Sequence, residues 1–163
     1  MASIYKMNEL FWGLLLTILP ISELRIGLPL VVDYALRNNI SLLPLFILVL
    51  MLNLLVIFFV FFFLDYLHKH LLKIKAYRKG FDFYLEKLRK RVDKFEKKFN
   101  EVGFLALILF VAIPLPGTGA YTGSLVVWVL GLERKKSIIS IALGVLLAGL
   151  LILLGSLGLL SLF

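Results

Sequence analysis

The sequence predicts an all-α integral membrane protein, a single domain over residues 1–163, built as an inverted repeat. We expect each half to be a re-entrant helical hairpin followed by a transmembrane helix, with a cytoplasmic amphipathic helix joining the halves. Two observations predict this class. Apolar residues make up 61% of the chain, against about 45–50% in a soluble globular domain. Uncharged runs cover residues 38–64, 102–132 and 137–163, which excludes a water-soluble enzyme.

The first half, residues 6–64, begins with Lys6 and an apolar stretch that superficially resembles a signal peptide. No small-x-small cleavage site follows it, so we expect the stretch to stay in the mature protein. Pro20 opens a turn, after which the chain returns and completes a re-entrant hairpin over 10–36. Residues 42–64 are then uncharged, and as a helix they are long enough to cross an apolar slab of about 30 Å.

The second half, residues 102–163, repeats this order. The uncharged stretch 103–132 is long enough to cross a membrane, but prolines and clustered glycines at 114–123 interrupt it, so it cannot form one continuous helix. Residues 137–163 form the second predicted transmembrane helix. Small residues recur in it at every fourth position, at Ser140, Gly144 and Ala148. Such a stripe lets another helix approach closely, either within the chain or in a homo-oligomer.

The distribution of positive charge indicates that residues 103–132 return to the side from which they enter. The connector 65–101 holds 12 of the 18 Lys and Arg residues, so the positive-inside rule places it in the cytoplasm. The three adjacent cations at 134–136 share that side only if 103–132 is a re-entrant hairpin. This topology puts both termini on the outer side of the cell membrane.

Two spacings indicate an internal repeat. Pro20 and Pro114 are 94 residues apart, and the starts of the two predicted transmembrane helices, at 42 and 137, are 95 apart. Each repeat contains one crossing, so the second copy enters the membrane upside down relative to the first. This arrangement is the inverted repeat found in many transporters.

The connector contains a predicted amphipathic helix with a basic opposite face. Its apolar positions follow a mean spacing of about 3.6 residues, at Tyr77, Phe81, Tyr84, Leu88, Val92, Phe95, Phe99 and Val102. It lies either on anionic lipid or against a partner. The net charge of +8 therefore points to membrane lipids and not to nucleic acid. His68 and His70 point to different helix faces, so we expect interfacial side chains and no metal site.

Chain breaks at mid-membrane predict a polar cavity, because unpaired backbone groups cost several kcal/mol each in hydrocarbon. Glu23 and Arg25 lie at the predicted tip of the first hairpin, where ionisable groups are costly and usually functional. Arg25 would bind an anion, and Glu23 would carry a proton. The alternative is that the two side chains neutralise each other or cap a helix. Asp33 and Arg37 are predicted to form an ordinary surface ion pair.

The second hairpin supplies the other candidate substrate-binding residues. Its returning half-helix would present free backbone N–H groups to an anion. The residues are Pro114, Pro116, Gly117, Thr118, Gly119, Thr122 and Gly123. The glycines could instead serve only to let the two hairpin tips cross closely.

The segments 20–29 (PISELRIGLP) and 112–123 (AIPLPGTGAYTG) resemble the signature stretches of the putative small multidrug export protein family. That resemblance covers nearly the whole chain and implies an integral membrane protein. The architecture is also similar to that of the DedA family, which implies movement of lipid headgroups such as polyprenyl phosphate or phospholipids. DedA-like proteins carry acidic residues in the first hairpin, which Glu23 matches, and arginines in the second, whereas 114–123 contains none.

Together these features predict a small membrane transporter or lipid flippase that acts on an anionic lipid headgroup and is coupled to protons. One alternative is a proton-coupled exporter of cationic amphiphilic drugs, which Arg25 disfavours. Another is a scaffold that uses the basic connector without transporting anything. An enzyme is disfavoured, because no histidine lies in a membrane segment and Ser124 has no visible base. We expect membrane lipids and a homo-oligomer as partners, with no cofactor and no metal.

Overall fold

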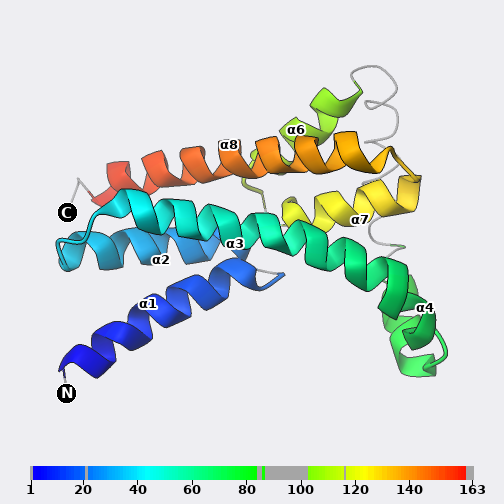
Figure 1. The fold of residues 1–163 in the computed structure, drawn as a ribbon, viewed down its shortest axis with the longest axis horizontal. Helices are drawn as coiled ribbons and strands as arrows, with labels where there is room; N and C mark the ends of the chain where they lie inside the picture. Colours follow the sequence, from blue (N-terminus) through cyan, green and yellow to red (C-terminus); the bar gives the residue numbers. More distant parts are fainter. Residues whose placement is uncertain (1, 21, 84–85, 87–102, 116, 161–163) are drawn as a thin grey trace.

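The computed structural model describes residues 2–20, 22–83, 86, 103–115 and 117–160, and the regular elements in this part of the chain are helices (Figure 1). Six longer helices carry the fold: α1 (Ala2–Ile18), α2 (Glu23–Arg37), α3 (Leu42–Phe62), α6 (Phe104–Ala112), α7 (Ala120–Leu130) and α8 (Arg134–Leu160). After α3 the chain continues through a π-helical turn, Phe63–Leu67, into the short helix α4, His68–Leu71. Residues 75–83 are again helical.

Two of the helices are long and apolar enough to cross a membrane. They are Leu42–Leu67, which includes the π-helical turn, and Arg134–Gly158. At 1.5 Å per residue each is more than about 35 Å long, compared with an apolar slab of about 30 Å. Many of their outward side chains are large, apolar and exposed, as lipid-facing side chains are, among them Phe58, Phe62, Leu151 and Leu154. The chain is therefore a membrane protein.

The helices α1 and α2 form an antiparallel pair whose turn lies beside the middle of α3 (Figure 1). Gly27 makes the close approach possible, because a Cβ at that position would lie 2.3 Å from Thr17 Cγ2. The buried Asn53 of α3 donates a hydrogen bond from Nδ2 to the carbonyl oxygen of Thr17 at 2.7 Å. This bond fixes the end of α1 against the long helix.

The helices α6 and α7 also run in opposite directions, but they enter from the other end of the molecule (Figure 1). Here α6 packs mainly on α8. A Cβ at Gly144 would lie 2.6 Å from Val111 Cβ, and Ser140 and Ala148 are buried on the same helix. The predicted small-residue stripe therefore receives a helix of its own chain, which is the first of its two explanations.

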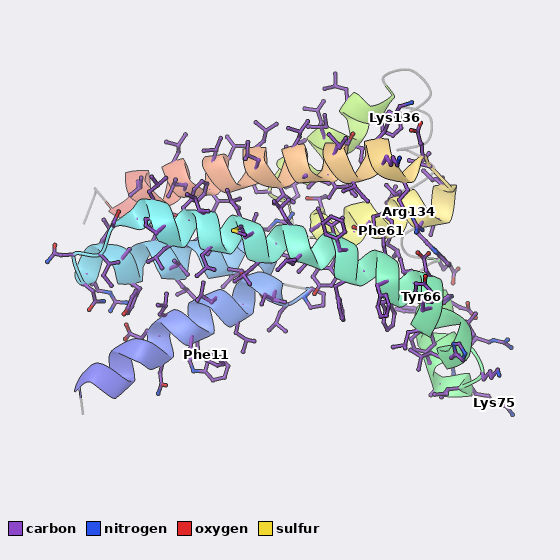
Figure 2. The ribbon with its side chains drawn as sticks, viewed as in Figure 1. Phe11, Phe61, Tyr66, Lys75, Arg134 and Lys136 are labelled. Atoms are coloured by element: carbon purple, nitrogen blue, oxygen red, sulfur yellow. The ribbon has the colours of Figure 1, made fainter. Side chains whose placement is uncertain are left out.

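The end of α3 and the start of α8 lie next to each other. Arg134 donates from Nη2 to Asp65 Oδ1 at 2.9 Å, and its guanidinium lies 4.9 Å from the centre of the Phe61 ring. Figure 2 shows Lys75, Arg134 and Lys136 at this same end of the molecule, whereas both chain termini lie at the opposite end (Figure 1). The cations at 134–136 thus lie at the connector end, as the charge distribution predicts.

Several predicted boundaries need correction. The first helix begins at Ala2, well before the expected apolar stretch. The second helix begins at Glu23, so Glu23 and Arg25 belong to its first turn and not to the preceding loop. The helix that follows the turn of the second hairpin, α7, begins at Ala120, inside the stretch 114–123 that was expected to interrupt the helix. The added turn is stabilised by a carboxylate from another helix, which local sequence patterns cannot reveal.

His68, predicted to be an interfacial side chain, is packed inside an aromatic cluster at the end of α3. His68 is buried, and its ring centre lies 4.2 Å from that of Phe81 and 5.3 Å from that of Trp128. Its Nδ1 is hydrogen-bonded to the Tyr77 hydroxyl at 3.0 Å. Tyr77 and Phe81 are the described members of the predicted amphipathic stripe, and they stack on each other. The rest of that stripe lies outside the described residues.

Candidate functional site

Glu23 lies at the point where the two hairpin turns meet. It is only 5% exposed, and its φ of +43° is uncommon for a residue with a side chain. Its Oε1 accepts a hydrogen bond from the backbone N–H of Tyr121 at 3.2 Å, and the backbone of Ala120 also interacts with the carboxylate. A carboxylate from α2 therefore caps the first turn of α7, a position that the helix dipole favours for negative charge.

Gly119, the residue just before α7, permits this contact. A Cβ at this position would lie 1.7 Å from Glu23 Oε2, which no side chain could tolerate without moving the carboxylate. Its φ of −168° is extended and open to any residue. The requirement for glycine at position 119 is therefore one of space alone.

Arg25 holds the loop that leads into α7. Its Nη2 donates to the hydroxyl of Thr118 at 2.8 Å and also to the Thr118 carbonyl oxygen. The Thr118 hydroxyl in turn donates to the carbonyl oxygen of Ile113 at 2.7 Å, so one guanidinium organises the turn between α6 and α7. Arg25 Nη1 lies 3.7 Å from Glu23 Oε2, and the two charges therefore compensate each other inside the protein.

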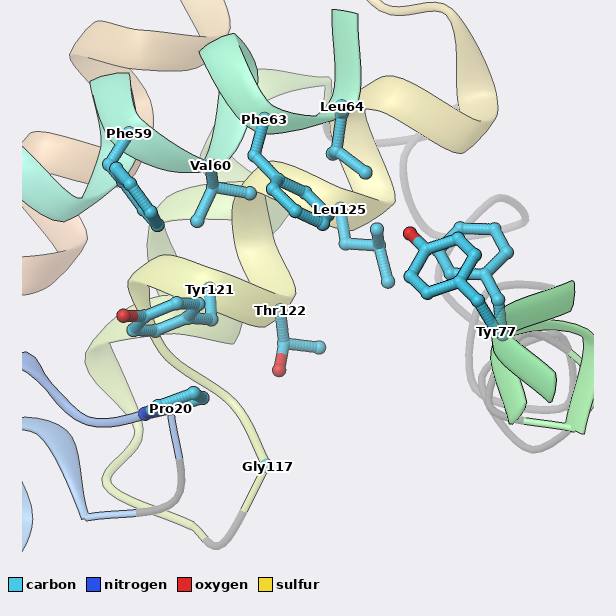
Figure 3. A pocket seen from close by; sticks show the side chains of 11 residues that line it. Pro20, Phe59, Val60, Phe63, Leu64, Tyr77, Gly117, Tyr121, Thr122 and Leu125 are labelled. Carbon is cyan, nitrogen blue, oxygen red and sulfur yellow. The ribbon is translucent and has the colours of Figure 1, made fainter. Parts of the chain in front are cut away.

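An apolar pocket of about 570 Å³ opens beside this polar cluster. It lies between α3, α7 and the helical segment 75–83, with one residue from each hairpin turn at its edge (Figure 3). The lining residues are Pro20, Phe59, Val60, Phe63, Leu64, Tyr77, Phe81, Gly117, Tyr121, Thr122 and Leu125. We call this space the aromatic pocket.

Tyr121 belongs to both the polar cluster and the aromatic pocket. Its backbone N–H binds Glu23, while its side chain lines the pocket. Its hydroxyl donates to the carbonyl oxygen of Ile18 at the end of α1, at 2.5 Å. The residue thereby ties both hairpins to the pocket, a role that sequence reasoning missed because an aromatic residue in an apolar run carries no distinguishing signal.

The structure brings together some of the predicted site residues and separates others. Thr118 and Gly119 contact the Arg25 and Glu23 side chains, whereas Gly117 and Thr122 line the aromatic pocket. Of the remaining predicted residues, Pro114 is exposed and Pro116 lies outside the described residues. At Gly123 an added Cβ would lie 2.8 Å from Val111 Cγ2. For Gly123 this favours the packing explanation.

Asn53 is a second residue of the polar cluster that was not predicted from the sequence. It lines a small cavity together with Glu23, Arg25 and Gly119. As the single polar side chain in the predicted helix 42–64, it stood out in the sequence, but its partner could not be identified there. Elsewhere, Arg37 binds the carboxylate of Asp33, as predicted, and also lies 3.6 Å from Glu9.

The described residues contain no group of three or more His, Cys, Asp or Glu side chains that could hold a metal ion. The candidate site itself combines the Glu23 carboxylate, the Arg25 guanidinium, the N-terminus of α7 and the aromatic pocket. No curated protein and no solved structure matches the chain. Residues 23–151, from Glu23 into the second half of α8, match a family model described as "Putative small multi-drug export protein". The chain belongs to this family.

Proposed function

We propose that the protein is a small membrane transporter or flippase for amphiphilic molecules with an anionic headgroup, such as a lipid phosphate. The observation that carries the proposal is the pairing of Glu23 with the N-terminus of α7, beside Arg25. An export family and two helices long enough to span a membrane support transport in general. The substrate is inferred from the chemistry of this cluster.

Transport also requires that the two hairpins be re-entrant. At 1.5 Å per residue the nine residues of α6 and the eleven of α7 reach only about 14 and 17 Å, half of an apolar slab. The Asp65–Arg134 contact supports a return of this hairpin to its side of entry. Two hairpins that enter from opposite faces and meet at Glu23 form an inverted repeat like that of DedA-like proteins, with the site near the midplane.

The mechanism we propose is competition for the N-terminus of α7. The Glu23 carboxylate occupies the backbone N–H groups that a substrate anion would need. When Glu23 takes up a proton, its affinity for the helix N-terminus falls, and the headgroup replaces it beside Arg25. For a singly charged headgroup the cluster is neutral in both states, because either Glu23 or the substrate balances Arg25. This avoids the large cost of an unbalanced charge in the membrane.

The same geometry disfavours a cationic drug as substrate. A cation would have to bind Glu23 while Arg25 Nη1 lies 3.7 Å from the carboxylate, and like charges at such distances repel. In the scaffold alternative, by contrast, the connector alone would matter. Removal of residues 77–99 would then abolish function, and changes at Glu23 or Arg25 would be silent.

Liposomes that contain the purified protein and a fluorescent phosphatidic acid test the proposal. We expect transbilayer movement of the lipid to depend on the protein and to be lost in Glu23→Gln and Arg25→Ala. Glu23→Gln keeps an oxygen for the Tyr121 N–H but removes the titrating group and the charge that balances Arg25. The headgroup then has no competitor that could release it from Arg25, which is why movement should be lost. The matched control is Arg37→Ala, which removes a surface arginine that also pairs with a carboxylate. Unchanged movement in both site variants rejects the proposed function.

A further inference from the structure

The aromatic pocket has the size and chemistry of a binding site. Its volume of about 570 Å³ falls within the roughly 300–1,000 Å³ typical of pockets for a single drug-sized ligand. Aromatic and aliphatic side chains form most of its wall, and Thr122, Tyr77 and Tyr121 are the lining residues with side-chain hydroxyls. Such a lining favours the apolar part of a ligand and offers little to a charged group.

The pocket adjoins the Glu23–Arg25 cluster at one end. Pro20 comes from the turn between α1 and α2, Gly117 from the turn between α6 and α7, and both line the pocket (Figure 3). Tyr121 bridges the two spaces through its backbone N–H and its ring. Glu23 and Arg25 do not line the pocket themselves. A molecule whose head lies at Arg25 would reach the pocket past Gly117 and Tyr121, which line it next to the residues that Arg25 and Glu23 bind.

At its other end the pocket is lined by side chains from outside the long helices. Tyr77 and Phe81 form this wall, across the pocket from Pro20, and Tyr77 is seen there in Figure 3. Both pack on the buried ring of His68, which also contacts Trp128 of α7. These ring contacts hold Tyr77 and Phe81 in place at this end of the pocket.

We infer that the aromatic pocket holds the apolar chain or ring system of the transported amphiphile, and that the Tyr77–Phe81 wall sets the chain length it accepts. This inference rests on the proposed function, because the head of the same molecule is placed at Arg25. It narrows the substrate class to molecules that join an anionic head to at least one apolar group of drug size, of which the pocket holds one. Free inorganic phosphate lacks the group that the pocket binds and is excluded from this class.

Photolabelling in vesicles tests the inference. The probe is hexadecyl phosphate with a photoreactive diazirine at the end of its chain, and labelled residues are identified by mass spectrometry. We expect labelling of Tyr77 or Phe81 that excess unlabelled hexadecyl phosphate suppresses and inorganic phosphate does not. Chains that merely partition into the bilayer would instead label exposed side chains such as Phe58 and Leu151, without saturation, and this result would overturn the inference.

Two pocket variants and one control distinguish binding in the pocket from contact with the lipid-facing surface. Leu125→Trp fills the pocket, and we expect it to reduce saturable labelling about tenfold, a loss of about 1.4 kcal/mol in binding. Leu151→Trp, at a lipid-facing position 53% exposed, is its matched control. Phe81→Ala removes part of the end wall without adding bulk, and it should shift the preference towards the longer icosyl phosphate probe. Equal labelling in Leu125→Trp, Phe81→Ala and the control Leu151→Trp contradicts the inference. Because two different pocket variants are compared, this conclusion does not depend on the folding of either one.

The outcome also separates the two proposals. If the pocket labels as expected while Glu23→Gln and Arg25→Ala leave transbilayer movement unchanged, the chain site stands and the proposed transport mechanism fails. If those two variants abolish movement while Leu125→Trp leaves labelling and movement intact, the transport mechanism stands and the chain site fails.

Discussion

The backbone N–H of Tyr121 in α7 donates a hydrogen bond to the carboxylate of Glu23 in α2, at 3.2 Å, although 98 residues separate them. Each residue lies in the first turn of the returning helix of its hairpin. The first hairpin thus caps a helix of the second. Any movement of one hairpin relative to the other must break this bond, so the contact couples the two halves of the molecule.

Gly119→Ala should disrupt this coupling. The added Cβ would lie 1.7 Å from Glu23 Oε2, so the carboxylate must leave the end of α7. We expect the free energy of unfolding, measured by denaturant titration in mixed micelles, to fall by about 1–3 kcal/mol. Gly155→Ala is the matched control, since nothing lies within 4 Å of a Cβ there. Adding Glu23→Ala to Gly119→Ala should remove the clash, and a double variant no more stable than Gly119→Ala would show that the contact is misassigned.

Asn53→Leu should loosen the first hairpin from α3. Asn53 is 1% exposed and donates its amide hydrogen to the Thr17 carbonyl oxygen at the end of α1. Polar contacts between membrane helices contribute about 0.6–1.7 kcal/mol, so we expect a loss of that size in the same titration. Met51→Leu, at a position 57% exposed on the same helix, should have no measurable effect. Equal stability of the two variants would mean that the Asn53 contact is energetically neutral.

Acid should open the aromatic cluster at the end of α3. Burial lowers the pKa of His68, and the charge of Asp82 opposes that shift. Because the folded pKa lies below the unfolded value of about 6.5, the neutral ring stabilises the fold above that pH. This stability is lost as the pH falls towards the folded pKa, since the unfolded chain then binds more protons.

Trp128 reports on this transition because its ring lies edge-on to His68. The chain contains two tryptophans, so Trp12→Phe provides a background with a single fluorophore. Between pH 8 and 5 we expect a change in Trp128 emission with a midpoint below about 6.5. The change should disappear in His68→Phe, which keeps a ring in the cluster. An identical titration in that variant would assign the change to another group.

The sequence allows much of the helical layout to be predicted, because long uncharged runs and helix-breaking prolines are local signals. The 42–64 helix closely matches α3, Leu42–Phe62, and the Asp33–Arg37 pair follows from helical spacing. The charge distribution also places Arg134 at the connector end, where Asp65 binds it.

Other features depend on contacts between distant segments and could not be predicted. The N-terminus of α7 was expected to face a substrate, but Glu23 caps it, a pairing that only the folded chain creates. His68 was expected to be an interfacial side chain, and its packing inside an aromatic cluster was not foreseen. Its burial depends on Trp128, which lies far away in the sequence. The residues of the polar cluster were therefore found more readily than their partners.

Cysteine labelling across intact vesicles tests most directly whether the chain turns back twice within the membrane. The chain has no cysteine of its own, so single substitutions can be compared without background: Glu9→Cys, Arg37→Cys, Lys75→Cys and Lys136→Cys. With a membrane-impermeant maleimide, the account predicts that positions 9 and 37 react from one side and positions 75 and 136 from the other. Opposite accessibility within either pair would contradict it, because that hairpin would then cross the membrane.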